Sequence, residues 1–528
     1  MSSDLLLPLL IVAPIVAAAL PVAFGLWTDR TGWPIAVLTT LGLFAGAVTV
    51  ARDVYAGIDV RHELGGYDRT YGIELVADEF STLIVLLVTG VALAVLAYTR
   101  RGGPRGNTFY SGYLLLTGGL LGISLTGDVF NLFVFLEISS LATYALIASG
   151  DGPEAAVAAL KYLILGTVAA SMYLIGVAFV FMATGTLNMA VLAETIPTVE
   201  RPTLLHAGLA FMIVGFATKV AQWPLHVWQP DAYNRAPDGV TPLIAALVST
   251  ASAYAFGRVL FTVFGVDYLA SIPYAAEIIV TVGCLSVLAG TTLAVVQREV
   301  KRMFAYSSVS QFGLVVAAYG VAISGATERA LTGAAIHLVG HGVMKAGLFL
   351  AAGVIAVSYG ARTVDEYAGL ADDRPVVAAA LAVLLISLIG IPPSVGFVGK
   401  WYIAIGAVEA QLWPVAAVIF LSTMLTLAYA ARLLEKMYFT PATPAESTPT
   451  AAHGTVATDG GADDEPDDVD NALAGAFDPT ERGRGSPDAV SAGMLAVAVL
   501  AAITVVVLGF GGGVFAELLE PFVTEVFN

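Results

Sequence analysis

The sequence has little cysteine and little charge for its length. Cys284 is the only cysteine among 528 residues, which excludes intramolecular disulfides, cysteine-ligated iron–sulfur clusters and zinc knuckles. No Gly-rich phosphate loop is present, because "GFGGG" at 509–513 ends a hydrophobic run instead of joining a strand to a helix. Only 12% of the residues are charged, against about a quarter in soluble domains. A soluble nucleotide-binding enzyme is therefore excluded, and no cofactor is expected.

Long hydrophobic runs recur along the whole chain. Each has enough residues to cross roughly 30 Å of hydrocarbon at about 1.5 Å per residue. The first follows "MSSD", which lacks a basic n-region, so it is expected to be a mature helix and not a signal peptide. The runs predict an all-α polytopic membrane protein of about 14 transmembrane helices at residues 5–27, 31–51, 77–99, 109–126, 129–149, 155–184, 203–235, 240–265, 274–297, 303–324, 329–358, 375–408, 412–436 and 489–511.

The chain divides into a transmembrane domain (1–440), a hydrophilic loop (441–488), a last span (489–511) and an amphipathic tail (512–528). The loop holds eleven acidic residues and two arginines, a net charge of −9 (2 − 11), which predicts a disordered, solvated segment. The whole chain carries −17, and such acidity is weakly indicative of a halophile. For the tail, two environments remain open: the outer membrane surface and a partner subunit.

The positive charges predict the topology. Nineteen of the 24 lysines and arginines lie in loops. Loops after odd-numbered spans hold fourteen of them: Arg30, Arg100, Arg101, Arg105, Arg235, Arg298, Lys301, Arg302, Arg362, Arg374, Arg432, Lys436, Arg482 and Arg484. Loops after even-numbered spans hold only Arg52, Arg61, Arg69, Arg201 and Arg329. Because basic loops stay in the cytoplasm, both termini of a plasma-membrane protein are expected outside.

The other five basic residues lie inside predicted spans: Lys161, Lys219, Arg258, Lys345 and Lys400. A charge at the bilayer centre costs about 2.5–3.5 kcal/mol on insertion scales, so such residues usually face a polar interior and mark ion pathways. Lys161 lies near a helix end, so a structural role, with its amine reaching the membrane surface, and a functional role are equally plausible. For Arg258, a structural anchor is the favoured interpretation. Glu137 is the carboxylate deepest in a span, and pairing with a buried lysine is the favoured interpretation over a purely structural contact.

Two spans carry prolines that an unbroken helix would exclude. Pro224 follows Lys219 in "FATKVAQWPLHVWQPDAYNRAPDG", and Pro392 and Pro393 precede Lys400 in "SLIGIPPSVGFVGKWYI". Proline removes a backbone donor, so the freed carbonyls need protein or water partners at membrane depth. Breaks beside lysines in spans five apart are typical of transporters built from structural repeats with discontinuous helices, here spans 4–8 and 9–13.

The stretch "AAIHLVGHGVMKAGLFLAAG" places His337, His341 and Lys345 four residues apart, on one face of about 12 Å of helix. Histidine titrates near physiological pH, so the group can relay protons. A packed structural histidine is the main alternative for either residue alone. A metal site is disfavoured, since no Cys, Asp or Glu stands near in sequence to complete a shell.

Four segments carry a family resemblance: "QWPLHVWQPDAYNRAPDGVTPLIAAL", "REVKRMFAYSSVSQFG", "HLVGHGVMKAGLFLAAG" and "GIPPSVGFVGKW". They resemble the proton-translocating antiporter-like family, over about residues 75–435. That family includes the A-type and D-type proteins of Mrp cation/proton antiporters, three antiporter-like proteins of respiratory complex I and relatives in membrane-bound hydrogenases; the chain looks most like the Mrp D type. The resemblance implies fourteen helices, two inverted five-helix repeats and broken spans 7 and 12.

The resemblance also implies roles. Glu137 and Lys219 match the family's gating pair, and Lys400 matches the lysine at the end of a central hydrophilic axis. His337, His341 and Lys345 match the connecting motif of the eleventh span.

One departure concerns the eighth span, where relatives commonly carry a bridging lysine and this chain has Thr250 in "VSTASAY". A hydroxyl relays a proton or holds water but stores no charge at neutral pH. Either water on Ser249, Thr250 and Ser252 completes the axis, or the two halves are coupled more weakly.

Two functions remain open at this point, and neither makes the chain an enzyme with its own redox chemistry. The first is a subunit of a multi-subunit Mrp-type Na⁺/H⁺ antiporter, with other membrane subunits as partners. The second is a proton-pumping subunit of a complex I-like or hydrogenase assembly.

Overall fold

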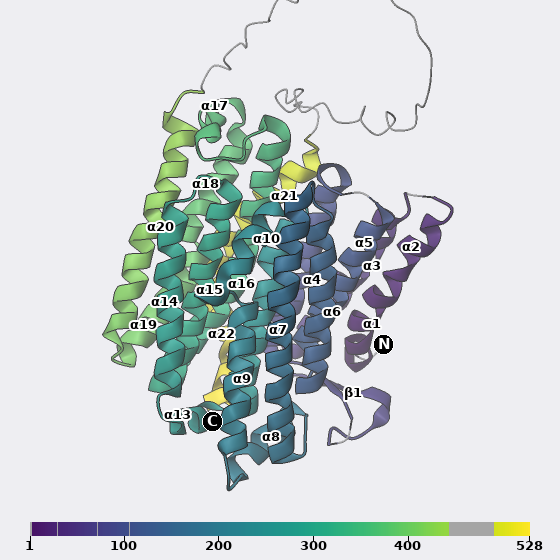
Figure 1. Ribbon diagram of the computed structural model, residues 1–528, viewed down its shortest axis with the longest axis vertical. Coiled ribbons are helices and arrows are strands. Elements are labelled where there is room, and N and C mark those ends of the chain that lie inside the picture. Colours follow the sequence, from purple (N-terminus) through teal and green to yellow (C-terminus); the bar gives the residue numbers. More distant parts are fainter. Residues whose placement is uncertain (1–2, 29, 71, 105, 443–489, 528) are drawn as a thin grey trace, which may run out of the picture.

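The apolar runs of the sequence form helices whose lengths match a membrane (Figure 1). The computed structural model describes residues 3–28, 30–70, 72–104, 106–442 and 490–527. Within these residues, twelve helical segments are long and apolar enough to cross a bilayer. They are α1 with α2 (Ser3–Ala17, Ala19–Gly25), α3 (Gly32–Val54), α4 (Glu79–Gly102), α5 (Asn107–Leu125), α6 (Val129–Ala148), α7 (Pro153–Thr184), the segment Thr241–Phe264, α14 (Ala275–Val295), α15 (Val300–Gly325), α16 (Glu328–Tyr359), α20 (Trp413–Phe439) and α21 (Ala492–Phe510).

Two further spans each consist of shorter helices, which brings the total to the fourteen that the sequence predicts. The seventh is α9 (Thr203–Lys219), the 3-10 turn η3 (Leu225–Trp228) and α10 (Gln229–Arg235). The twelfth is α18 (Pro375–Ile389) followed by α19 (Val395–Glu409). The prolines lie in or beside the gaps, as expected for residues that remove a backbone donor. The prediction of an all-helical membrane fold with breaks in spans 7 and 12 is confirmed.

Equivalent helix pairs pack closely in the two repeats: α5 against α6, and α14 against α15. Glycine permits both contacts. A Cβ on Gly119 would lie 2.9 Å from the backbone nitrogen of Ser139, and one on Gly290 would lie 2.5 Å from that of Ser310. Backbones approach this closely in membranes where a small residue faces the neighbouring helix. In Figure 1, α16 runs between α4–α7 on one side and α14, α19 and α20 on the other.

The eighth span departs from the regular helix expected for residues 240–265. It consists of α11 (Thr241–Leu243), the π-helical segment η4 (Ile244–Val248), α12 (Ser249–Arg258) and the π-helical segment η5 (Val259–Phe264). Like α16, this span is almost entirely buried inside the protein. π-helical turns occur preferentially at functional sites. The irregular span is therefore buried inside the bundle. It is also the span in which similar proteins commonly carry a lysine and this chain has Thr250.

Short elements cover the two ends of the bundle. The strands β1 (Val60–Glu63) and β2 (Glu74–Ala77) form an antiparallel hairpin around the turn η1 (Leu64–Gly66), with Val60 opposite Ala77. The helices α8 (Met189–Thr195), followed by η2 (Ile196–Thr198), and α13 (Val266–Ser271) lie at the same lower end in Figure 1. The turn η6 (Asp365–Tyr367) and α17 (Leu370–Asp373) follow α16, and α17 lies at the upper end. Loops after even-numbered spans thus group opposite this loop after an odd-numbered span, while the assignment of the odd-numbered loops to the cytoplasm stays a prediction.

The C-terminal tail forms α22 (Gly512–Phe527), which packs on its own chain against α4 and α16. Its apolar face buries Phe515, Leu519, Phe522 and Val523. The ring of Phe522 lies 5.3 Å from that of Phe80 in α4, centroid to centroid. The apolar face of the tail is therefore covered by its own chain. The sequence left open the outer membrane surface and a partner subunit, and this arrangement is neither of the two. The predicted acidic loop at 441–488 lies almost wholly outside the described residues.

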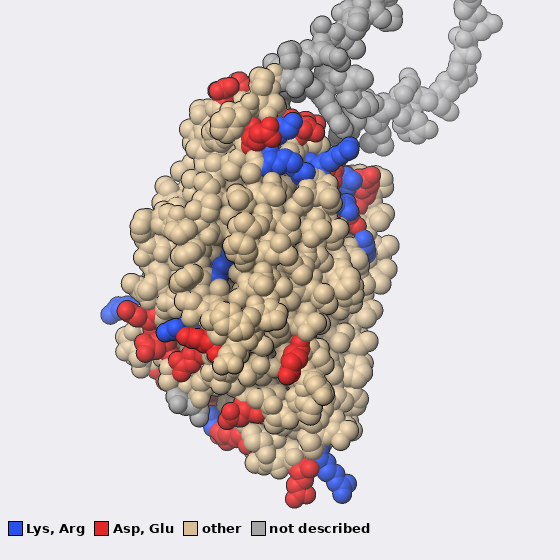
Figure 2. All heavy atoms as spheres, turned by 90° about the vertical axis from the view of Figure 1, so that its left-hand side faces the viewer, with Lys and Arg blue, Asp and Glu red and all other residues tan. Residues whose placement is uncertain are grey.

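Charged side chains are scarce on the flank of the bundle. In Figure 2 the acidic and basic groups of one face gather mostly towards its two ends, and the area between them is largely uncharged, with a basic group visible in a hollow. A largely apolar belt of this kind is what lipid contact requires. Among the membrane-embedded charges, Lys219, Lys345 and Lys400 are buried, whereas the Lys161 side chain is 38% exposed.

Candidate proton pathway

Glu137 and Lys219 lie together, as their depths in the sequence predict. Lys219 is the last residue of α9, and its Nζ lies 3.5 Å from Oε1 of Glu137 in α6. The same Nζ donates a hydrogen bond to Oγ of Ser140 at 2.6 Å. Lys219 is 4% exposed and Glu137 is 23% exposed, so the amine is the more deeply buried partner. One lysine therefore has both a carboxylate and a hydroxyl partner on the neighbouring helix.

The helix break explains why Lys219 is free to reach α6. The carbonyl oxygens at the end of α9 are satisfied by other donors: the indole Nε1 of Trp228 donates to Thr218 at 2.9 Å, and the backbone nitrogen of Gln222 donates to Ala217 at 2.8 Å. A lysine at a helix end otherwise tends to bond the last carbonyls. Neither Ser140 nor Trp228 was among the predicted residues, although Ser140 stands one helical turn after Glu137.

Lys400 lies at the second break but in a different environment. Its Nζ donates to the carbonyl oxygens of Leu388 at 3.0 Å and Ile389 at 2.9 Å, the last two residues of α18. These carbonyls are freed by the break and carry the negative end of the helix dipole. Among the described residues no carboxylate forms an ion pair with Lys400. The amine is therefore held by backbone, across the gap between the two half-helices.

The three residues predicted on one face of α16, His337, His341 and Lys345, are all buried, and their side chains contact α15. The rings of His337 and His341 lie 6.2 Å apart, centroid to centroid, with planes inclined by 21°. Lys345 donates to the carbonyl oxygen of Phe304 at 2.7 Å and to Oγ of Ser307 at 2.5 Å. The predicted alignment on one helical face therefore holds, although Lys345 is tied to α15.

The two histidines differ in their contacts. Nε2 of His337 lies 2.9 Å from Oε1 of Gln311, whereas both ring nitrogens of His341 are buried without a partner among the described residues. The ring of Phe312 meets His341 edge-on at 4.8 Å between centroids. His337 thus has one fixed hydrogen bond, and His341 has an aromatic neighbour in place of one.

The hydroxyls of the eighth span point to different partners. Ser249 shares a hydrogen bond of 2.8 Å with Tyr233 Oη, which also accepts from Gln229 Nε2 at 3.0 Å. Ser252 donates to the carbonyl of Val248 in its own span at 2.9 Å. Oγ1 of Thr250 is buried and has no partner among the described residues. The spatial link between Thr250 and the rest of the pathway therefore stays a prediction.

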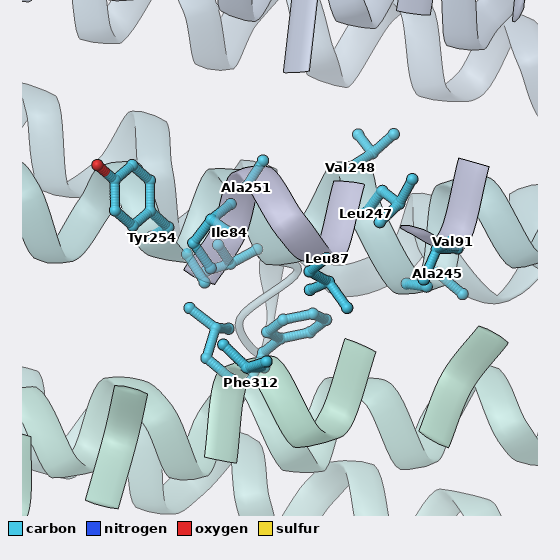
Figure 3. Packing of buried hydrophobic residues seen from close by; sticks show 14 of the residues in the cluster. Ile84, Leu87, Val91, Ala245, Leu247, Val248, Ala251, Tyr254 and Phe312 are labelled. Carbon is cyan, nitrogen blue, oxygen red and sulfur yellow. The ribbon is translucent and has the colours of Figure 1, made fainter. Parts of the chain in front are cut away.

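Apolar side chains fill the region around the eighth span. Figure 3 shows Leu87 of α4 above the ring of Phe312, with Leu247, Val248 and Ala251 of the eighth span nearby. On the other side, a Cβ on Gly342 of α16 would lie 2.7 Å from Leu87 Cδ2, so Leu87 packs tightly against α16 next to His341. Apolar side chains therefore surround this part of the eighth span.

The other two membrane-embedded basic residues are fixed by ion pairs. Lys161 pairs with Asp231 at 2.7 Å, and Asp231 also pairs with Arg302 at 3.2 Å. Arg258 pairs with Asp78 and donates from Nε to Tyr254 Oη at 2.9 Å. These contacts join separate helices, which fits the structural role that the sequence favours for Arg258.

An ion-pair cluster, which the sequence did not reveal, joins the two halves of the protein at one end of the bundle. Asp238, between α10 and α11, pairs with Lys301 of α15 at 3.0 Å and with Arg362 at 3.3 Å. Lys301 also donates to the carbonyl of Ala236 at 2.7 Å. Burial raises the pKa of Asp238, but Lys301 and Arg362 outweigh it and hold that pKa below its usual value.

The sequence profile of the NADH:quinone oxidoreductase/Mrp antiporter transmembrane family matches residues 126–426. That range covers more than half of the chain and includes every candidate residue from Glu137 to Lys400. This chain belongs to that family.

Similar proteins in this family include subunits of redox enzymes and subunits of antiporters. The chain is 40% identical over 404 residues to the N subunit of NADH-quinone oxidoreductase from Desulforudis audaxviator, covering 75% of this chain and 79% of the relative. It is 33% identical over 397 residues to the D-type protein of the Na⁺/H⁺ antiporter from Alkalihalophilus pseudofirmus, covering 74% and 79%. A chain in the Mrp complex of Dietzia sp. DQ12-45-1b superposes with a TM-score of 0.86 at 27% identity, covering 100% of this chain and 98% of that one.

Proposed function

We propose that this chain is the proton-translocating subunit of a multi-subunit Mrp-type Na⁺/H⁺ antiporter in the cell membrane. The observation that carries the proposal is the position of Lys219, with its buried amine between Glu137 and Ser140 at the end of a broken helix. The similarity over the full length to a chain of a solved Mrp complex supports the antiporter assignment. The partners would be the other membrane subunits of that assembly, and the transported ions H⁺ and Na⁺.

The proposed mechanism starts from the ion pair. A carboxylate beside a buried lysine favours the protonated amine, whereas burial alone favours the neutral one. Lengthening the distance between Glu137 and Lys219 therefore releases a proton, and shortening it retains one. Ser140 offers the amine a second partner that remains when the carboxylate moves away. The pair thus acts as a switch controlled by the rotamer of the Glu137 side chain on α6 relative to Lys219 on α9.

The proton is proposed to travel laterally from Lys219 through the eighth span to His337 and then to Lys400. His341 and Lys345 are assigned secondary roles, because the ring nitrogens of His341 have no hydrogen-bond partner among the described residues and Lys345 is bonded to α15. Buried polar atoms without protein partners are normally hydrated, and Thr250 Oγ1 and His337 Nδ1 are of this kind. Water at Thr250 would have to bridge the apolar region in which Figure 3 places Leu87 and Phe312.

The test is Na⁺-driven proton transport by the assembled complex in membrane vesicles. Glu137→Ala and Lys219→Ala are each expected to abolish transport while the complex still assembles. Glu409→Ala provides a matched control, since it removes the acidic partner of Arg329 from an exposed ion pair at the edge of the bundle. Retained transport in either of the first two variants, at normal expression, would refute the assignment.

A second candidate is a proton-pumping subunit of a redox enzyme, favoured by the 40% identity to the N subunit of a NADH-quinone oxidoreductase. The same buried residues would serve, with electron transfer in other chains. Purification of the intact complex distinguishes the two. Small antiporter subunits among the co-purifying chains support the antiporter, whereas iron–sulfur or quinone-binding subunits support the redox pump.

The proposed orientation places both termini outside the cell, on the basis of the fourteen basic residues in loops after odd-numbered spans. Protease-accessible tags at each terminus of the chain, in intact cells, test this arrangement. Cleavage of both tags from the outside is expected, and protection of either one contradicts it.

A further inference from the structure

Gln311 lies where it fixes the orientation of one histidine of the pathway. It belongs to α15, is 3% exposed, and its Oε1 lies 2.9 Å from Nε2 of His337. A carbonyl oxygen only accepts hydrogen bonds, so this contact requires the ring hydrogen on Nε2. The neutral ring then presents Nδ1 as a bare acceptor, and Nδ1 is buried without a partner among the described residues.

The backbone of His337 packs directly against α19. A Cβ on Gly399 would lie 2.6 Å from Cβ and 2.7 Å from Cα of His337, so only glycine lets the two helices approach this closely. The next residue along α19 is Lys400. The titratable groups next to His337 on these two helices are therefore Lys400 of α19 and His341 of α16, whose ring lies 6.2 Å from that of His337, centroid to centroid. The group facing it from α15 is the neutral Gln311 amide.

We propose that Gln311 is a positioning residue, which holds His337 so that protons enter and leave through Nδ1 alone. This inference rests on the proposed proton path. A hydrated proton at Nδ1 would form the Nδ1–H bond as an O–H bond of the hydronium breaks, leaving water and an imidazolium. The reverse transfer from Nδ1 to water or to a neutral Lys400 amine restores the neutral ring. The amide takes up no proton in either step.

Gln311 also favours the protonated ring. When both ring nitrogens carry hydrogen, the bond from Nε2 to the Gln311 carbonyl becomes charge-assisted and stronger than in the neutral ring. A carboxylate at the same position would strengthen this preference, and an alkyl group would remove it. The two substitutions should therefore move the titration of His337 in opposite directions, which loss of packing alone would not do.

The experiment measures the pH profile of Na⁺-driven proton transport in vesicles that contain the whole complex. Because His337→Ala is expected to abolish transport, the titration of this residue is followed as the transition of the wild-type profile that moves in the Gln311 variants. In Gln311→Leu that transition is expected to move to lower pH by about one unit, the size expected for one lost hydrogen bond to a charged ring. In Gln311→Glu it is expected to move to higher pH.

Ser310→Ala is the matched control. Ser310 is the preceding residue of α15 and is also buried, and its Oγ bonds Thr291 at 2.7 Å without contacting His337. It should leave the transition in place. An unchanged transition in both Gln311 variants, or a shift of the same sign in both and in Ser310→Ala, overturns the inference. Normal transport by His337→Ala would instead remove His337 from the proposed pathway, and the inference with it.

Discussion

The two broken helices share a sequence pattern, but their lysines have different hydrogen-bond partners. Lys219 and Lys400 are both buried, and each lies beside a proline-containing gap in spans five apart. Lys219 bonds side chains of a neighbouring helix, whereas Lys400 bonds two backbone carbonyls of the half-helix before it. A side chain moves by rotamer changes, but a helix end moves only with its helix. The first lysine is therefore suited to switching, and the second to a response that follows movement of α18.

The largest expected effect separates pairing from proton release at the first break. Lys219→Arg keeps a positive charge near Glu137, but guanidinium does not release its proton in proteins. The complex should assemble normally, while Na⁺-driven proton transport falls by about 100-fold or more, within the range for a lost proton-transfer group. Transport near the wild-type rate would show that Lys219 acts only as a fixed charge.

The second largest effect is expected at Lys400, beside the second break. Lys400→Met leaves the carbonyls of Leu388 and Ile389 without their donor, so thermal stability in detergent should fall as well as transport, by roughly 1–3 kcal/mol in free energy of unfolding. Lys400→Arg should recover the stability but not the transport. At the first break, Trp228 and Gln222 already donate to the carbonyls at the end of α9, and Glu137→Gln combined with Lys219→Met removes both the amine and the carboxylate that it would leave unpaired. This double variant should keep its stability, and a loss equal to that of Lys400→Met would contradict the comparison.

A smaller effect is expected between the two halves. Thr250→Val removes the unpaired hydroxyl with little change of volume, and transport should fall about tenfold if water at this position carries protons. Thr250→Ser retains the hydroxyl and serves as the control. Indistinguishable rates in all three proteins would show that the pathway avoids Thr250.

The smallest expected effect on transport lies at the ion-pair cluster that joins the halves. Asp238→Asn should lower the free energy of unfolding by about 2 kcal/mol, less than the roughly 3–5 kcal/mol of a fully buried pair, because Arg362 is 60% exposed. Transport per assembled complex should change little. A large transport defect without loss of stability would instead place Asp238 in the pathway.

The same cluster gives a pH dependence. The pKa of Asp238 is lower in the folded protein than its ordinary value of 3.8. Its contribution to stability is therefore fully present above pH 4 and is lost as the pH falls through the lower folded value. The wild-type protein should lose more stability on acidification than Asp238→Asn, as measured by thermal unfolding in detergent.

The sequence predicted features that depend on local pattern. Hydrophobic run length gave the spans, and proline position gave the two breaks. Helical periodicity placed His337, His341 and Lys345 on one face. The pairing of Glu137 with Lys219 was also predicted, because a mid-span carboxylate has few alternatives to a buried cation.

Features that depend on the rotation of one helix against another were not predicted. Trp228 satisfies a carbonyl ten residues earlier in the chain, and Gln311 reaches a histidine in the next helix. The π-helical segments of the eighth span and the docking of α22 on α4 and α16 follow from packing across the bundle. No single stretch of sequence encodes these contacts, since each needs two distant segments to be placed first.

The most direct test of the central claim is a double-mutant cycle between Glu137 and Lys219, read as Na⁺-driven proton transport by the purified complex in proteoliposomes. If the two residues act as one switch, Glu137→Gln and Lys219→Met will each remove nearly all transport, and the double variant will be no slower than the more damaged single variant. Losses that multiply in the double variant, or a Glu137→Gln complex that transports at the wild-type rate, would contradict it.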